Sequence, residues 1–294
     1  MSNFWSLWII ALFLICNAAL LWLLLSNTKT DIEPNQVKSH VYDGIEEYDN
    51  PLPSWFFNLF LATMIFGAIY LALYPGLGNF KGFLGWTSTN EWQVSVDKAE
   101  GEFMTLVTPL MDKSAAELSN NPKAIKMGQR IYKNNCAICH GVDAKGAYAF
   151  PNLTDNDWLY GGTEENIQQS ITHGRKGLMP AWKSILGQDL DSMVDYVVLL
   201  SDNNGREAEH PLHEKFGMLC GACHGKNGSG NQAMGAPNLR DNIWLYGGST
   251  AEIKVTLEQG RQGVMPAFQA ALSPERIHLV MSYIYFLNES LQQP

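Results

Sequence analysis

Charged residues are scarce in this sequence, at 17 % of its 294 residues, whereas Trp and Tyr are plentiful. Part of the chain is therefore expected to lie outside water. The net charge of −9 argues against a nucleic-acid partner, because a phosphate backbone attracts basic surfaces. Cysteine is also rare. Four of the five cysteines fall in two short motifs and leave Cys16 alone in an apolar run, so no disulfide framework is expected.

The two cysteine motifs are Cys136-Ala137-Ile138-Cys139-His140 and Cys220-Gly221-Ala222-Cys223-His224. In a Cys-x-x-Cys-His motif, both thiols can add to the vinyl groups of a haem as thioethers, and the histidine can ligate the iron. Zinc sites that pair two Cys-x-x-Cys units usually hold them about 15–20 residues apart, whereas 84 residues separate these two. A thioredoxin-like redox pair would need a βαβ context, which neither motif has. We therefore expect two covalently bound haems c, attached through Cys136, Cys139, Cys220 and Cys223 and ligated by His140 and His224.

Two uncharged runs predict membrane spans. Phe4 to Leu25 has 22 residues and Trp55 to Tyr74 has 20, and about 20 helical residues cross a hydrocarbon core. Aromatic residues lie near the ends of both runs, as expected at a membrane interface. The first run has no basic start and no small-residue cleavage site, so we expect it to be retained rather than removed as a signal peptide.

The two predicted spans form a hairpin in the membrane. Between them, residues 26–54 carry Lys29 and Lys38, whereas no Lys or Arg precedes Phe4. The positive-inside rule therefore favours a cytoplasmic loop. Haem attachment to c-type cytochromes takes place on the outer side of the bacterial inner membrane, so the residues after Pro75 are expected in the periplasm. The predicted segments are a first span at 1–25, a cytoplasmic loop at 26–54, a second span at 55–75 and a periplasmic linker at 76–120.

The rest of the chain is a tandem repeat, with units predicted at 121–203 and 204–294. Each unit is expected to contain a helix before the motif, a Gly-rich loop, a short helix and a closing helix, the last at Asp189 to Leu200 and at Pro274 to Leu287. Three pairs of segments match: Pro151-Asn152-Leu153 with Pro237-Asn238-Leu239, Trp158-Leu159-Tyr160-Gly161-Gly162 with Trp244-Leu245-Tyr246-Gly247-Gly248, and Gly174 to Pro180 with Gly260 to Pro266.

Methionine is the expected sixth ligand. Met179 lies 39 residues after His140, Met265 lies 41 residues after His224, and both precede a proline. A thioether opposite a histidine fills the last axial position, so such haems move electrons rather than activate oxygen. The alternative, that both methionines only fill the core, would not explain why the repeats keep Met-Pro in register.

Other candidate ligands have weaker support. His173 is matched by Gln259 in the second repeat, and Met234 falls inside a two-residue insertion. Arg175 and Arg261 precede the methionines, and both a haem-propionate partner and a solvated side chain remain open for them.

The chain resembles the CcoP/FixP family, the dihaem cytochrome c subunit III of cbb3-type cytochrome c oxidases. The resemblance covers nearly the whole length and rests on His40 to Pro53, on Tyr74 to Gly82 with Gly85-Trp86-Thr87, and on the tandem haem repeats. Many members have a single span before the haem domains, whereas this sequence has the further run Phe4 to Leu25. The resemblance implies three partners besides membrane lipid: a catalytic subunit with haem b and copper, a monohaem cytochrome c subunit and a donor cytochrome c.

These observations predict an all-α fold, with two N-terminal transmembrane helices followed by two tandem class I cytochrome c domains. The leading function is an electron-transfer subunit of a terminal oxidase in the bacterial inner membrane, which has no catalytic residues of its own. A free-standing, membrane-tethered dihaem carrier is the alternative, although it would not need a second span with a specific loop. A dihaem peroxidase would need one haem with an open sixth position, which the paired Met-Pro motifs disfavour.

Overall fold

The computed structural model describes residues 1–28, 36–48, 50, 52–202 and 205–292. The chain divides into two compact units, residues 1–102 and 103–294.

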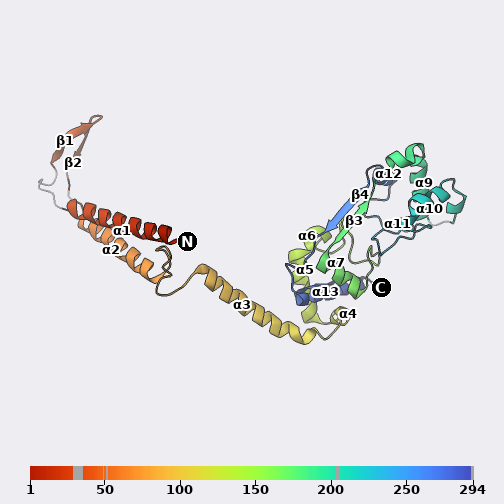
Figure 1. Ribbon diagram of the computed structural model, residues 1–294, viewed down its shortest axis with the longest axis horizontal. Coiled ribbons are helices and arrows are strands. Elements are labelled where there is room, and N and C mark those ends of the chain that lie inside the picture. Colours follow the sequence, from red (N-terminus) through yellow and green to blue (C-terminus); the bar gives the residue numbers. More distant parts are fainter. Residues whose placement is uncertain (29–35, 49, 51, 203–204, 293–294) are drawn as a thin grey trace. The chain divides into compact units, whose positions relative to one another are not determined.

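Two long helices dominate the first unit, α1 (Asn3–Ser26) and α2 (Ser54–Leu73), which lie side by side (Figure 1). Both are long and apolar enough to cross a membrane, in agreement with the predicted spans. Few of their side chains are buried within the chain. Such apolar surface is what a lipid environment requires of a helix whose backbone groups bond internally.

A turn after α2 ties the two helices together. The backbone N–H of Asn79 donates to Oγ of Ser6 at 2.9 Å, and Ser6 is one of the buried residues of α1. Gly78 has a φ of +61°, and a Cβ there would overlap Ser6. A glycine is therefore needed both for the backbone conformation and for the close approach. This contact fixes where α1, the additional N-terminal span, meets the turn that follows α2.

The loop between the helices contains a hairpin that the sequence analysis did not anticipate. Strands β1 (Val37–Tyr42) and β2 (Ile45–Tyr48) pair antiparallel. Asp43 and Gly44 join them with φ values of 47° and 83°, and an Asp-Gly pair favours such left-handed turns. Part of the predicted loop, including Lys29, lies outside the described residues.

The predicted linker at 76–120 also has more structure than expected. It includes the 20-residue helix α3 (Ser88–Val107), the short 3₁₀ helix η1 (Thr108–Leu110) and α4 (Ala115–Leu118). Val107 and Leu118 are fully buried with Ala124 and Leu279. The packing of the second unit therefore begins before residue 121.

The helices predicted in each repeat are present. In the first repeat they are α5 (Pro122–Asn135), α6 (Ala137–His140), α7 (Glu164–His173) and, after the short α8 (Lys183–Leu186) and η2 (Gly187–Asp189), the closing helix α9 (Leu190–Ser201). The second repeat has η3 (Glu207–Glu209), α10 (His213–Leu219), α11 (Gly221–His224), α12 (Thr250–Gln259) and the closing helix α13 (Pro274–Gln292). Tyr196 and Tyr283 of the closing helices are buried in the core.

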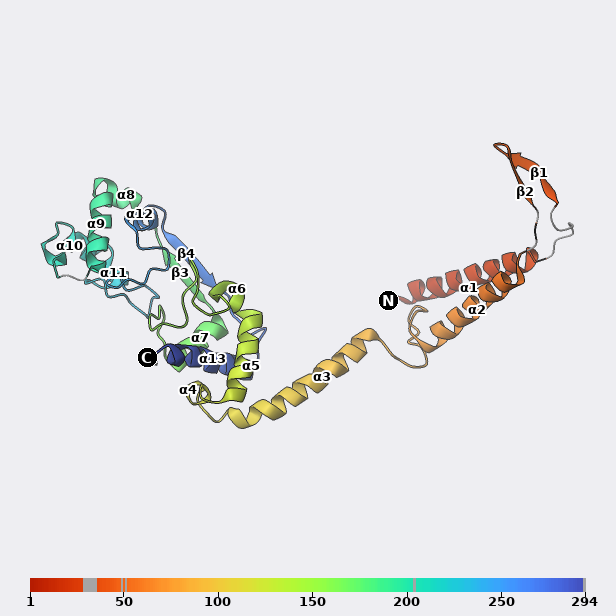
Figure 2. The same cartoon turned by 180° about the vertical axis from the view of Figure 1, so that it is seen from behind.

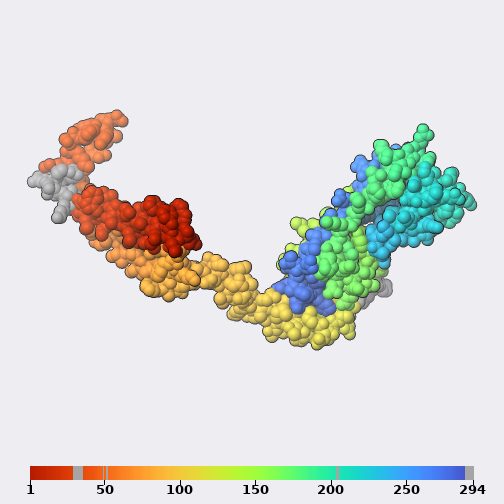
Figure 3. Space-filling view, in the orientation of Figure 1, coloured from red at the N-terminus to blue at the C-terminus, as the bar shows by residue number. Residues whose placement is uncertain are grey.

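The closing helices are exchanged between the repeats. Helix α13 packs against α5 and α7 of the first repeat, and α9 packs against α12 of the second (Figures 1 and 2). In Figure 3 the blue atoms of the C-terminal segment lie against the green atoms of the first repeat and the yellow atoms of the segment before it. We call the group formed by α4, α5, α6, α7 and α13 the first lobe, and the group formed by α8, α9, α10, α11 and α12 the second lobe.

A two-stranded ribbon carries the chain across. Strand β3 (Arg175–Met179) pairs antiparallel with β4 (Arg261–Met265), with Gly177 opposite Gly263. Beyond the strands, Trp182 N–H donates to the carbonyl of Leu257 at 2.7 Å, and Phe268 N–H donates to that of Ile171 at 3.0 Å. The segment that follows each strand is thus hydrogen-bonded to the other repeat. The predicted domain bounds, 121–203 and 204–294, stay a prediction of where the repeats begin and end, because both packed cores draw on both repeats.

Candidate haem sites

Each cysteine motif forms one helical turn directly after a longer helix. In the first motif, the N–H of His140 donates to the carbonyl of Cys136 at 3.0 Å, and in the second that of His224 donates to Cys220 at 2.9 Å. This turn places both cysteines of a motif next to its histidine. All four thiols are free. Burial raises the pKa of Cys136 and of Cys220 to about 11, so these thiols are protonated at neutral pH.

Both histidines are buried, with 8 % of their surface exposed. Nδ1 of His140 lies 3.0 Å from the carbonyl oxygen of Pro151, and Nδ1 of His224 lies 3.0 Å from that of Pro237. Because a carbonyl only accepts, Nδ1 carries the proton and donates. Burial lowers the pKa of both imidazoles and outweighs the opposite effect of these hydrogen bonds. Neutral rings with a lone pair on Nε2 are what iron ligation requires, so the donor set fits a haem.

The orienting prolines were not singled out as site residues in the sequence analysis. The signal was present, because each proline begins a Pro-Asn-Leu triplet that both repeats share. Its meaning was hidden, since the backbone carbonyl, not the side chain, contacts the histidine.

The two methionines lie at opposite ends of the β3–β4 ribbon, where Met179 pairs with Arg261 and Met265 pairs with Arg175. Met265 packs against the buried cluster of the first lobe, which also contacts Cys136 and includes Tyr132. Met179 packs against the cluster of the second lobe, together with Cys220. The spacing in sequence had paired each methionine with the histidine of its own repeat. The packing instead groups Met265 with the first motif and Met179 with the second.

Each arginine of the ribbon stacks on a tyrosine of its own repeat. The guanidinium of Arg175 lies 4.5 Å from the ring centre of Tyr160, and that of Arg261 lies 4.7 Å from that of Tyr246. Nε of Arg175 donates to Ser170 Oγ, and Nε of Arg261 donates to Thr256 Oγ1, both at 2.9 Å. Both arginines are therefore packed side chains rather than freely solvated ones.

The other candidate ligands lie away from both cores. His173 and Met234 are exposed, the latter by 55 %. Three further histidines have packing roles: His213 Nδ1 lies 2.9 Å from the Tyr196 hydroxyl, His210 contacts the Tyr196 ring, and His278 Nε2 lies 2.8 Å from the carbonyl of Lys113. Within the described residues, no group of three or more His, Cys, Asp or Glu side chains is placed to hold a further metal ion.

The histidines are buried with oriented rings, a cysteine pair lies beside each, and the methionines pack in the same cores. These features define a c-type cytochrome with two candidate membrane helices. Comparison with known families agrees. Residues 35–81 match the family model for the N-terminal domain of cytochrome oxidase cbb3, FixP. Residues 123–197 and 208–284 match the model for cbb3-type cytochrome c oxidase subunit III.

Curated relatives match over most of their length. The chain is 39 % identical to the cbb3-type oxidase subunit CcoP of Rubrivivax gelatinosus, over 99 % of this chain and 98 % of the relative. It is 38 % identical to subunit FixP of Azorhizobium caulinodans, over 85 % of this chain and 92 % of that relative. It is 33 % identical to subunit CcoP of Cereibacter sphaeroides, over 85 % of this chain and 93 % of that relative. The chain belongs to the CcoP/FixP family of cbb3-type cytochrome c oxidase subunits, and its cytochrome c domains carry electrons.

Proposed function

We propose that this chain holds two haems c, one on each motif, and relays electrons from a donor cytochrome c towards a catalytic subunit with haem b and copper. A monohaem cytochrome c subunit is the other expected partner in the complex. The observation that carries the proposal is that both motifs keep the same buried, Nδ1-bonded histidine beside two free thiols. We further propose that the haem lobes lie in the periplasm and the loop at 26–54 in the cytoplasm.

The haem supplies a one-electron redox centre when bound, and the chain supplies its environment. Cys136 and Cys139 would hold one haem, and Cys220 and Cys223 the other. The hydrogen bonds to Pro151 and Pro237 keep each imidazole in one orientation and tautomer. The methionines, each packed in an apolar core, would supply the second protein ligand to each iron and exclude other ligands.

We also propose that the axial ligands are exchanged between repeats, so that Met265 serves the haem of His140 and Met179 that of His224. The support is that each methionine packs against the same buried cluster as the first cysteine of the other repeat's motif. The exchange can be tested in a chain with Cys220→Ser and Cys223→Ser, which retains only the first haem. In that background Met265→Leu should abolish methionine ligation, seen by loss of the ferric thioether charge-transfer band. Met179→Leu should leave it, and the reverse result would restore pairing within each repeat.

A pyridine haemochrome assay tests the proposed function. The tagged chain is purified from native membranes in mild detergent, and haem c and haem b are counted per chain. The proposal predicts haem b in fixed ratio and haem c in excess of two per chain, contributed by the monohaem subunit. Two haems c without haem b would contradict the oxidase assembly, and one haem c would contradict the dihaem assignment.

A further inference from the structure

Helix α5 presents a basic face that ends at the first cysteine motif. Its four basic residues are three or four positions apart, so they lie on one side of the helix, and all four are exposed: Lys123, Lys126, Arg130 and Lys133. The opposite side is buried through Ala124, Gly128 and Tyr132. Helix α5 contains no acidic residue, although the whole chain has a net charge of −9. We call these four residues the basic face of α5.

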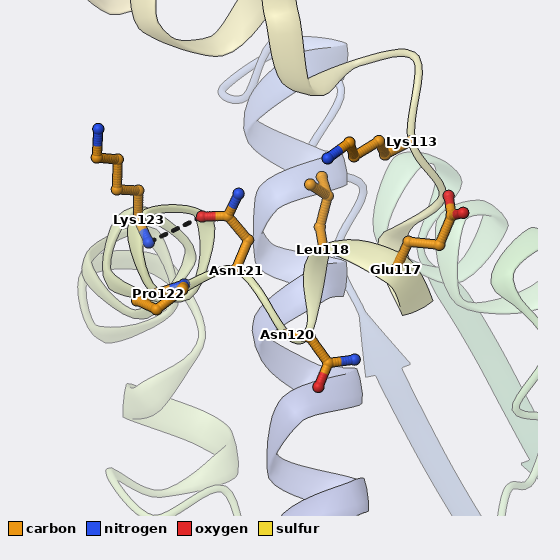
Figure 4. A pocket seen from close by; sticks show the side chains of 7 residues that line it. All are labelled: Lys113, Glu117, Leu118, Asn120, Asn121, Pro122 and Lys123. Atoms are coloured by element: carbon orange, nitrogen blue, oxygen red, sulfur yellow. Dashed lines mark hydrogen bonds between the residues drawn. The ribbon is translucent and has the colours of Figure 1, made fainter.

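The described residues give the basic face no ion-pair partner. At the start of α5, an open hollow of about 550 Å³ has Lys113, Lys123 and a single carboxylate, Glu117, among its seven lining residues. Figure 4 shows Glu117 and Lys123 on opposite sides of it, with Leu118 between them. Glu117 accepts from Ser114 N–H at 2.8 Å, within the cap of α4, and this bond lowers its pKa. It therefore serves its own helix terminus.

The second repeat lacks this face. The same offset of 84 residues that aligns the two cysteine motifs places Glu207, His210, Glu214 and Gly217 where the first repeat has its four basic residues. Such residues ordinarily form a solvated charged face. That role does not explain why all four positions are basic in the first repeat whereas two of the four are acidic in the second. The contrast points to a function that only the first lobe performs.

The basic face adjoins an exposed apolar patch, made by Ile138 of α6 and Val142 in the turn that follows. Lys133 is three residues before Cys136, and Ile138, between the two cysteines, is 93 % exposed. Val142 beyond the motif is also exposed. In the second motif the residue at the position of Ile138 is Ala222. A small apolar centre with a charged rim is the usual composition of a transient protein interface, and here the thioether-forming cysteines flank that centre.

We propose that the basic face of α5 and the apolar patch at Ile138 form a docking surface for the acidic face of a soluble redox protein, which exchanges electrons with the first lobe. Opposite charges raise the rate of encounter and orient the partner, and contact at Ile138 brings the partner next to the cysteines that hold the haem. This inference rests on the proposed electron-transfer function. The adjoining apolar patch favours a protein over an anionic lipid surface, because lipid headgroups would need only the charge.

The test uses the full chain in phosphatidylcholine nanodiscs and, as probe, a reduced monohaem cytochrome c with a net negative charge. The variant Lys126→Gln/Arg130→Gln/Lys133→Gln removes three charges from the basic face. Its second-order rate constant for electron transfer should fall about tenfold at low ionic strength, and the difference should disappear as salt screens the surface. Ile138→Ser should lower the rate at both ionic strengths. A matched control, Lys183→Gln/Lys226→Gln/Lys254→Gln, removes the same charge from the second lobe and should change the rate less than about twofold.

Equal rates in both triple variants would overturn the docking surface, as would an effect seen only when phosphatidylglycerol is added to the discs. Hexaammineruthenium(II), a small cationic reductant, separates this failure from that of the proposed function. If it reduces wild type and variant alike, a slow reaction with the acidic cytochrome reports docking. If no reductant reduces the wild-type chain, both the relay and the docking surface are contradicted.

Discussion

At the scale of single residues, three carboxylates from both repeats influence one another. Asp155 and Asp157 belong to the first repeat and Asp241 to the second. Burial, and then the charges of Asp241 and Asp155, raise the pKa of Asp157. Burial is also the main cause of the raised pKa of Asp155. Burial and mutual repulsion of these carboxylates therefore destabilise the contact between the repeats when they are ionised.

Replacing Asp157 with Asn should stabilise the chain at neutral pH. A carboxyl whose pKa is raised by folding favours the folded state at low pH, and this contribution is lost as pH rises through the folded pKa. The variant avoids that loss. At pH 7 its unfolding temperature should therefore exceed that of wild type, and its free energy of unfolding should be higher by less than about 1 kcal/mol. The gain should vanish below about pH 3.9, the pKa of a free aspartate. Asp143→Asn, at an exposed position of the same lobe, controls for the removal of a surface charge, and an equal gain at both pH values would contradict the argument.

At the scale of helices, the crossing of α5 and α13 depends on Gly128. A Cβ at this position would overlap the carbonyl oxygen of Leu279 and lie 2.9 Å from Cβ of Tyr283. The backbones of the two helices therefore approach more closely than a larger residue allows. Tyr132 and Tyr283, whose ring centres are 5.5 Å apart, continue the contact along the helices.

Gly128→Ala should destabilise the first lobe by about 1–3 kcal/mol, the usual cost of overfilling a packed core. Gly217→Ala in α10 provides the matched control, because nothing lies within 4 Å of a Cβ there and alanine favours a helix interior by up to about 1 kcal/mol. Denaturant unfolding, followed by the circular dichroism of the helices, should shift in opposite directions for the two variants. A Gly128→Ala chain that unfolds at the wild-type midpoint would show that α13 can move away without cost.

The helices themselves could be predicted from the sequence, whereas their pairing could not. The apolar spacing placed both closing helices to within a few residues, and the spacing of the cysteine motif placed both histidines. Both repeats, however, carry the same apolar pattern, so the surface that accepts α13 resembles the one that accepts α9. A pattern that is the same in both copies cannot show which closing helix packs on which motif. The β1–β2 hairpin and the helical part of residues 76–120 were missed because short strands and mixed polar helices have weak periodic signals.

At the scale of the whole molecule, the exchange makes the two repeats one folding unit. The core of the first lobe includes Ile277, Val280 and Tyr283 of α13, and that of the second includes Val194 and Tyr196 of α9. A single repeat would expose one of these apolar surfaces to water and would also leave one strand of the ribbon without its partner. The tandem arrangement is therefore a structural requirement, in addition to its proposed role of holding two redox centres.

A chain that ends after Asp202 makes this requirement measurable. It retains the first motif and Met179 but lacks α13 and Met265. We expect its haem to be attached through Cys136 and Cys139, and to bind carbon monoxide when reduced, because the proposed sixth ligand is missing. The control is the full-length chain with Cys220→Ser and Cys223→Ser, which carries the same single haem together with Met265 and should not bind carbon monoxide. If the shortened chain also resists carbon monoxide, Met179 can close the site within its own repeat. The exchange would then be one of two arrangements open to the chain, and the single repeat, rather than the pair, would be the unit that folds.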